Sequence, residues 1–302
     1  MVDVIGVPDR SSDQHYVERL PHPGLRSVIS FGFVQQVSED APPYVHRSVP
    51  NGSIEVSCQL GSAIPVVTGA HHGPDVSTLE PGSSVVGVRL RPGAAEAVLG
   101  IPASELTDRR VPLDLVWGRS SDELVSRLAD ATSAKEASML LERALLARAA
   151  TAAEPDPVVG ELVRRLQPWR ARRVTDQASD LFLSPRHLRR RCLEAIGHGP
   201  KVLHRILRFQ AFLVLTEGAD GDADLAGAAV TAGYADQAHL TRECSRLSGL
   251  TPRTFQAERA ARCLGSHDHG PSLMHVRRAL RLASATNPDS SVSFKTGRPA
   301  SS

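Results

Sequence analysis

His187-Leu188-Arg189-Arg190-Arg191-Cys192 is a stretch that this chain repeats. Gly197 and Pro200 follow it. The second copy starts 52 residues later, as His239-Leu240-Thr241-Arg242-Glu243-Cys244, and is followed by Gly249 and Pro252. Six positions are identical at this single offset, namely His, Leu, Arg, Cys, Gly and Pro. Chance seldom produces such spacing, so the repeat predicts a duplicated structural unit.

Each copy is predicted to form a helix with two different faces. Ser184 with Pro185 starts the first helix and Asp236 starts the second, and a glycine ends each. The apolar stripe, predicted to be buried, holds Leu188, Cys192 and Ile196 in one copy and Leu240, Cys244, Leu247 and Ser248 in the other. The opposite stripe carries Arg186, Arg189 and Arg190 in the first copy and Gln237, Ala238, Thr241 and Arg242 in the second.

A shorter helical segment precedes each of these helices, at residues 175–181 and 225–232, and Gly233-Tyr234-Ala235 joins the second pair. Two helices joined by a tight turn, the second with donors facing outward, are typical of a helix-turn-helix. Residues 200–216 should form a linking helix about 25 Å long at 1.5 Å per residue. Such a rod could place two reading helices in successive major grooves, about 34 Å apart, on a non-palindromic site.

Three segments resemble the AraC/XylS family of transcriptional regulators over residues 158–260. They are Ser184-Pro185-Arg186-His187-Leu188-Arg189-Arg190, Arg208-Phe209-Gln210-Ala211, and the run from Gly233-Tyr234-Ala235-Asp236-Gln237 to Gly249-Leu250-Thr251-Pro252. The resemblance implies a sequence-specific DNA-binding protein, with activation favoured. It places base contacts on the outward residues that the periodicity had selected. Arg191 points off that face and is predicted to contact phosphate or remain a surface charge.

The chain departs from the family pattern at four residues. Cys192 and Cys244 stand where the family usually has phenylalanine, which predicts looser packing. Gln177 replaces an apolar residue before the first reading helix, and Phe182 stands where the turn normally has glycine. Both changes bear on the geometry of the first module. The paired His187 and His239 adjoin buried leucines and are expected to be partly buried scaffold.

The charge is unevenly distributed along the chain. The 302 residues suggest two domains, and 41% hydrophobic with 23% charged residues is typical of a soluble globular protein. The net charge of +2 divides into −7 over residues 1–157, +6 over 158–262 and +3 over 263–302. A basic back half is typical of a protein that touches a polyanion. No apolar stretch reaches the ~18 residues that cross a bilayer, so we expect a cytoplasmic protein with no membrane partner.

The front half is predicted to be rich in strands. Residues alternate between apolar and polar at 53–60 and again at 85–90, as in half-buried strands. Residues 94–99 are predicted to form a short helix closed by Gly100, and frequent Pro and Gly over residues 42–82 indicate turns between short strands. Ser133 and Glu136 form a capping box before a helix over 137–150.

The predicted fold class is therefore α+β. A β-rich, barrel-like regulatory domain with trailing helices occupies residues 1–150, and residues 151–157 form a linker. An all-α domain at 158–262 holds two helix-turn-helix modules joined by a linking helix. Residues 263–302 are expected to be a disordered tail, with only 273–285 able to form a helix.

Metal and thiol sites are weakly indicated. His22, His46, His71 and His72 could bind a metal in a barrel-like domain, but no carboxylate follows at suitable spacing, so no metal or cofactor is expected. The four cysteines, Cys58, Cys192, Cys244 and Cys263, show no metal-binding spacing, and Cys58 is predicted to be a buried inert thiol. Arg89 and Arg91 share a strand face that either holds an anionic effector or is an ordinary polar surface.

The leading hypothesis is a transcription factor that binds double-stranded DNA through Arg186, Arg189, Arg190, Arg191, Gln237, Ala238, Thr241 and Arg242. A small-molecule effector, RNA polymerase and a second copy of the chain are its further candidate partners. One alternative is a cupin-like, metal-dependent enzyme using His46, His71 or His72. Another is a ligand-binding or partner-binding module whose DNA-reading part has decayed. No catalytic motif stands out, so the sequence favours a non-enzyme.

Overall fold

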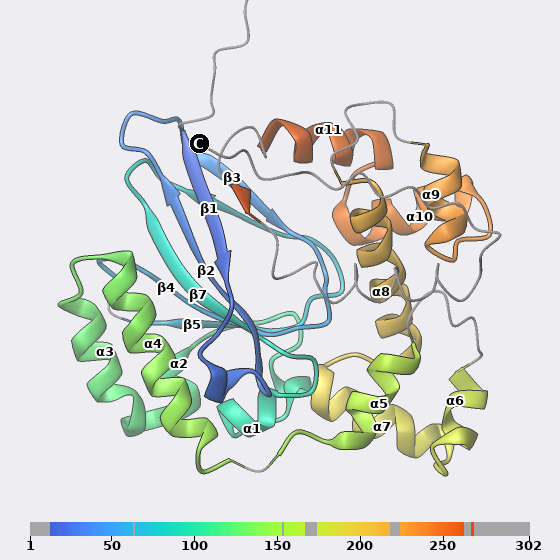
Figure 1. Cartoon of the computed structure of the whole chain (residues 1–302), viewed down its shortest axis with the longest axis horizontal. Coiled ribbons are helices and arrows are strands. Elements are labelled where there is room, and N and C mark those ends of the chain that lie inside the picture. The colour runs from blue at the N-terminus through green and yellow to red at the C-terminus, as the bar shows by residue number, and fades with distance from the viewer. Residues whose placement is uncertain are drawn as a thin grey trace, which may run out of the picture.

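The computed structural model describes residues 13–62, 64–152, 154–166, 174–217, 224–262 and 267–268. A sheet region, residues 13–149, lies beside a helical region, residues 157–262 (Figure 1). The helix predicted over 273–285, most of the predicted tail and Cys263 lie outside the described residues. No helix among the described residues is long and apolar enough to cross a membrane.

The sheet region contains an open antiparallel sheet extended at one edge by a short parallel strand. The seven strands are, in spatial order, β8 (Arg110–Pro112), β5 (Val66–Thr68), β4 (Glu55–Gln59), β7 (Ser84–Leu90), β2 (Ile29–Val37), β1 (Gln14–Arg19) and β9 (His267–Asp268). Two further strands, β3 (Tyr44–Ser48) and β6 (Asp75–Leu79), pair only with each other within the described part. The prediction of a barrel-like domain is therefore wrong as to closure, because the sheet ends at β8 and β9 instead of returning on itself.

The predicted strand alternation is confirmed. Val56 and Cys58 of β4, and Val86, Val88 and Leu90 of β7, are all buried. They face four helices: α1 (Ala95–Leu99), α2 (Leu113–Trp117), α3 (Asp122–Ala129) and α4 (Ala134–Ala149). Figure 1 shows α3 and α4 beside the sheet, away from the helical region.

Local signals set the ends of these helices. Gly100 ends α1 in the left-handed conformation, at φ 78°. The Ser133 hydroxyl accepts a hydrogen bond from the Glu136 amide at 3.3 Å, as the capping box predicts. The Glu136 carboxylate instead accepts from the amide of Thr132 at 3.0 Å, one residue earlier than the motif requires.

Two residues of the predicted tail form a strand. The backbone of β9 pairs in parallel with β1, with Tyr16 opposite His267 and Val17 opposite Asp268. The prediction of disorder is wrong for this short segment. An edge strand can take up a further strand through its backbone groups, as β1 takes up β9 here.

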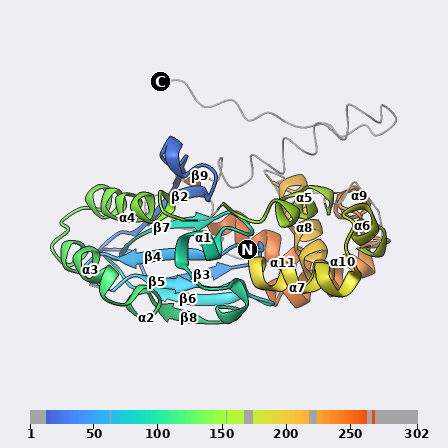
Figure 2. The ribbon, with the colours of Figure 1, turned by 90° about the horizontal axis from the view of Figure 1, so that it is seen from below.

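The helical region follows the predicted order closely. Its helices are α5 (Pro157–Arg165), α6 (Val174–Asp180), α7 (Pro185–Ile196), α8 (Pro200–Leu215), α9 (Leu225–Thr231), α10 (Gln237–Ser248) and α11 (Pro252–Arg262). The repeated sequence forms α7 and α10, and α8 is the predicted link between them. In Figure 2, α7 and α10 lie on the same side of this region.

The linking helix α8 contributes to two separate cores. Leu203 and Leu207, near its start, pack in a cluster with residues of α5, α6 and α7. Phe209 and Phe212, further along, pack in a second cluster with residues of α9, α10 and α11. The Arg205 guanidinium also pairs with the Glu243 carboxylate of α10 at 2.7 Å. Each module is thus built onto one half of a single helix, so α8 ties their positions together.

Candidate nucleic-acid interface

The two reading helices are built alike at both ends. Ser184 and Asp236 are their N-caps, and each side chain accepts a hydrogen bond from the amide three residues later, at 3.2 Å and 2.6 Å respectively. Gly197 and Gly249 end the helices in the left-handed conformation, at φ 83° and 76°. Glycine adopts this conformation without the steric cost that a Cβ imposes. The caps confirm the predicted ends.

The predicted division into two faces is confirmed by burial. Leu188, Cys192 and Ile196 in α7, and Leu240, Cys244, Leu247 and Ser248 in α10, are buried. Arg186, Arg189 and Arg190 are exposed on α7, as are Gln237, Ala238 and Arg242 on α10. Thr241 is half-buried, and its hydroxyl donates to the Gln237 carbonyl at 2.9 Å.

The exposed face of α7 borders a hollow of about 620 Å³. Arg186, Arg189 and Arg190 line it together with His187, and Ser104 of the sheet region lies at its side. His187 is exposed, so the prediction that it is partly buried scaffold is wrong. The position of His187 in the first turn of α7 could have identified it as an outward-facing residue, because the first residues of a reading helix approach base edges.

His239, the repeat partner of His187, has a different environment. It is half-buried, as predicted, with its ring edge-on to Tyr234 at 5.2 Å between centroids. The first module has no tyrosine at the equivalent place, since Leu183 occupies it. The repeat therefore does not give the two histidines the same role.

Arg191 lies away from the exposed stripe and pairs with Asp156. Its Nη2 and Nε lie 2.7 Å and 2.8 Å from the two carboxylate oxygens. Burial acts to raise the pKa of Asp156, but the hydrogen bonds and charge of Arg191, together with the backbone amides of Val158 and Val159, outweigh it and hold that pKa below its ordinary value. Asp156 also caps α5. A phosphate contact by Arg191 stays a prediction, and it would require this ion pair to open.

Two family comparisons match separate parts of the chain. Residues 177–258 match a family described as a helix-turn-helix domain. The C-terminal region is an AraC-type helix-turn-helix domain. The chain is a DNA-binding transcriptional regulator. Ahead of the AraC-type domain, residues 17–112 match a family described only as a domain of unknown function (DUF6597). No curated protein matches the chain.

Solved structures of ToxT from Vibrio cholerae are similar in outline. ToxT of strain O395 has 11% identity and a TM-score of 0.40, over 70% of this chain and 95% of that one. ToxT of strain SCE256 with bound unsaturated fatty acid has 10% identity and a TM-score of 0.36, over 80% of this chain and 93% of that one.

The turn of the first module contains a non-glycine residue in the left-handed conformation. Phe182 has φ 54°, and the equivalent residue of the second module is Gly233, at φ 84°. The equivalence follows from the next amide in each turn, because Leu183 bonds to the Ala178 carbonyl as Tyr234 bonds to that of Ala229. Phe182 is also 96% exposed. The backbone thus keeps the shape that glycine favours, and the ring extends into solvent.

Replacing Phe182 by glycine should therefore stabilise the protein by about 1 kcal/mol, because the Cβ that opposes the left-handed conformation is removed. Urea denaturation of the full chain measures the difference. Phe182→Ala is the matched control, since it removes the exposed ring but keeps the Cβ. Equal stability of the glycine and alanine variants would contradict the explanation.

The other three residues that differ from the AraC family pattern, Cys192, Cys244 and Gln177, are buried. Cys192 and Cys244 are fully buried, and burial raises the pKa of Cys192 to about 12. Burial likewise raises the pKa of Cys58, so all three thiols are poor nucleophiles, as predicted for Cys58. Gln177 is 1% exposed, and its Oε1 has no hydrogen-bond partner among the described residues.

The histidines considered as metal ligands do not converge. Among the described residues, no group of three or more His, Cys, Asp or Glu side chains could hold a metal ion. His71 and His72 instead contact Asp108, whereas the His22 ring accepts from the Gly24 amide and His46 lies near Tyr44. The helix-turn-helix match of residues 177–258 does not favour the cupin-like enzyme.

Arg89 and Arg91 do not form a joint anion site. Arg89 pairs with Glu55 at 2.6 Å and lies over the Phe31 ring. Arg91 donates to the Arg26 carbonyl at 2.6 Å. The cavity beside Arg89 has a volume of only about 30 Å³. Each guanidinium is thus committed to a different acceptor in the protein.

Proposed function

We propose that the chain reads a non-palindromic DNA site by placing α7 and α10 in successive major grooves. In this proposal residues 1–150 form the regulatory domain, and residues 158–262 form the DNA-binding domain. The observation that carries it is the pair of helices with caps at the same positions, joined through α8, whose exposed stripes hold hydrogen-bond donors. These are the positions at which the sequence predicts base contacts.

The side chains on the two helices differ in what they would recognise. Arginine donates two hydrogen bonds to O6 and N7 of guanine, and glutamine pairs with N6 and N7 of adenine. The Arg186, Arg189 and Arg190 set of α7 suits guanine. Gln237 and Arg242 of α10 suit a mixed sequence, and the small Ala238 suits a thymine methyl group. The different sets are consistent with a site whose two halves differ.

A cleft between the sheet region and the helical region supports a regulatory role for the first domain. A cleft of about 550 Å³ lies between the two regions and is lined on one side by Glu96 and Arg148, and on the other by Asp156 and Arg191. Its volume is in the range of small-molecule sites. We propose that an effector, and contacts with RNA polymerase or a second copy of the chain, act through the regulatory domain. We propose no catalytic role.

Selecting bound fragments from a random duplex pool tests the proposal. Two half-sites of different sequence, centred about one helical turn apart, are expected. Recovery of a single half-site, or of a palindrome with identical halves, would contradict the reading by two unlike helices.

Arg242→Ala should then cost about 1–3 kcal/mol on the selected site and relax the preference at one base pair. Its binding to random DNA should change less, since that binding depends mainly on phosphate charge. Arg246→Ala is the matched control, because Arg246 lies on the same helix and pairs with Glu243 at 3.8 Å. Fluorescence anisotropy titrations on both duplexes give the comparison. Equal losses of Arg242→Ala on selected and random DNA would exclude base reading by Arg242.

A further inference from the structure

The sheet region contacts both reading helices at the same place, their C-terminal ends. The Thr107 hydroxyl lies 3.2 Å from the carbonyl oxygen of Gly197, the residue that caps α7, and also 3.2 Å from the Ala103 carbonyl of its own region. The Arg47 Nη1 donates to the carbonyl of Ser248, the last residue of α10, at 3.1 Å. Carbonyls at a helix C-terminus have no partner within the helix and carry partial negative charge. A donor of the sheet region therefore lies within hydrogen-bond distance of a carbonyl at each helix end.

Close packing accompanies both contacts. At α7, a Cβ added to Gly197 would come within 2.6 Å of the Thr107 hydroxyl, and the His72 ring is edge-on to His198 at 4.5 Å. At α10, the Arg47 Nε donates to the Glu258 carboxylate of α11 at 2.9 Å. Arg47 thus holds both α10 and the helix that follows it. Each contact between the sheet region and a reading helix therefore consists of a hydrogen bond together with further packing or an ion pair.

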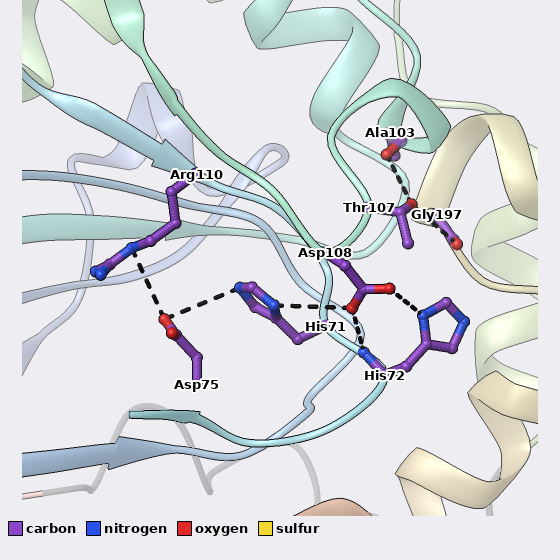
Figure 3. A network of polar contacts seen from close by, with 8 residues as sticks. All are labelled: His71, His72, Asp75, Ala103, Thr107, Asp108, Arg110 and Gly197. Carbon is purple, nitrogen blue, oxygen red and sulfur yellow. Dashed lines mark hydrogen bonds and ion pairs between the residues drawn. The ribbon is translucent and has the colours of Figure 1, made fainter. Parts of the chain in front are cut away.

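A chain of polar contacts runs from Asp108, beside the α7 contact, to Asp75 in the sheet region (Figure 3). Asp108, next to Thr107, accepts hydrogen bonds from the His72 amide and ring at 2.8 Å and 2.7 Å. The His71 ring lies between Asp108 and Asp75, 3.8 Å and 3.9 Å from their oxygens. Asp75 belongs to β6, whose partner β3 carries Arg47. The supports of the two helices are therefore parts of one connected structure.

The same region also contacts α8, at Leu203 near its start and at Gln210 past its middle. The Gln210 side-chain amide donates to the Pro50 carbonyl at 2.8 Å. Val49 packs against the core of the second module, and Gly52 approaches Leu203 so closely that a Cβ would lie 3.0 Å from it. Residues 49–52 follow β3 directly, so this contact is continuous with that of Arg47.

We propose that Arg47 and Thr107 are positioning residues that set the separation of the two reading helices. Half-site spacing would then be decided by the sheet region as well as by α8. This inference rests on the proposed function, because it concerns how two helices meet two grooves. A rearrangement of the segment 71–75 or of Asp108 would shift both supports together, and so change spacing preference without touching DNA.

The test measures spacing preference with the full chain. Duplexes carry the two selected half-sites at the selected spacing and at spacings changed by one or two base pairs. The double variant Arg47→Ala/Thr107→Val removes both donors. Its ratio of affinities between best and altered spacings should fall at least about fivefold, a typical coupling magnitude. Its affinity for one isolated half-site should equal that of the unaltered chain, which also shows that both modules remain folded.

Matched variants separate positioning from general weakening. Thr107→Ser keeps the hydroxyl and should retain the spacing preference that Thr107→Val lowers. Arg109→Ala is the control for Arg47, because the Arg109 guanidinium donates to the Glu105 carbonyl of its own region, at 3.0 Å. If the double variant has the spacing profile of the unaltered chain, the inference is wrong and the proposed function stands. If the unaltered chain shows no preference for paired half-sites, the proposed function itself fails, and the inference with it.

Discussion

Replacing Phe209 by alanine is expected to lower the free energy of unfolding by about 3–5 kcal/mol. Phe209 is fully buried in the middle of α8, stacked on Phe212 at 6.2 Å and tilted against Phe255 of α11 at 5.8 Å. Truncation to alanine removes these contacts and leaves a cavity in a closely packed core. Because whole domains are stable by only about 5–15 kcal/mol, this loss is a large part of the total.

Urea denaturation and DNA binding together measure the effect of Phe209→Ala. The second module should loosen first, since its core contains Phe209, so binding to the half-site read by α10 should weaken most. Phe182→Ala is the matched control, because it removes the same ring from a position that is 96% exposed. If Phe209→Ala lowers the free energy of unfolding by less than about 1 kcal/mol, the prediction is wrong. Neighbouring side chains would then fill the cavity, or the core around Phe209 would not be closely packed.

Acid should destabilise the contact between the two regions through His198. His198 follows the end of α7 and is fully buried, and burial, followed by the nearby His72, lowers its pKa from 6.5 to about 4. Asp108 and the backbone of His71 act to raise the pKa of His198, whereas the His71 ring adds a smaller lowering effect. In the unfolded chain His198 takes up a proton near pH 6.5, whereas in the folded chain it stays neutral until about pH 4.

The difference between the pKa of His198 in the unfolded chain and in the folded chain makes stability depend on pH. Between pH 6.5 and 4 the unfolded state binds more protons, so stability is fully present above pH 6.5 and is lost as the pH falls. At about 1.4 kcal/mol per pH unit, the loss through His198 is on the order of 3 kcal/mol.

Urea denaturation at a series of pH values checks this prediction. His198→Phe keeps a buried ring that does not titrate, so this variant should lose correspondingly less stability on acidification than the unaltered chain. His187→Gln, which replaces an exposed histidine, is the control for the loss of a histidine side chain as such. The explanation is wrong if the His198→Phe variant and the unaltered chain lose the same stability over this range.

Local and periodic features could be read from the sequence. The ends of α7 and α10 depend on Ser184, Asp236 and two glycines, which act on amides and carbonyls only a few residues away. The buried stripes of both helices follow from the helical period, and those of β4 and β7 follow from strand alternation. These patterns determined the order of the elements, the duplicated module and which residues of the reading helices face outward.

Contacts between distant segments were decided only by the tertiary structure. Arg191 meets Asp156 across 35 positions, and Arg47 meets Ser248 across 201, and neither pairing has a period that a sequence can display. The exposure of His187, the open sheet and the strand β9 likewise depend on what lies opposite in space. A residue's own neighbours in the chain set its conformation, but its partner is set by how whole elements pack, and packing is a property of the complete fold.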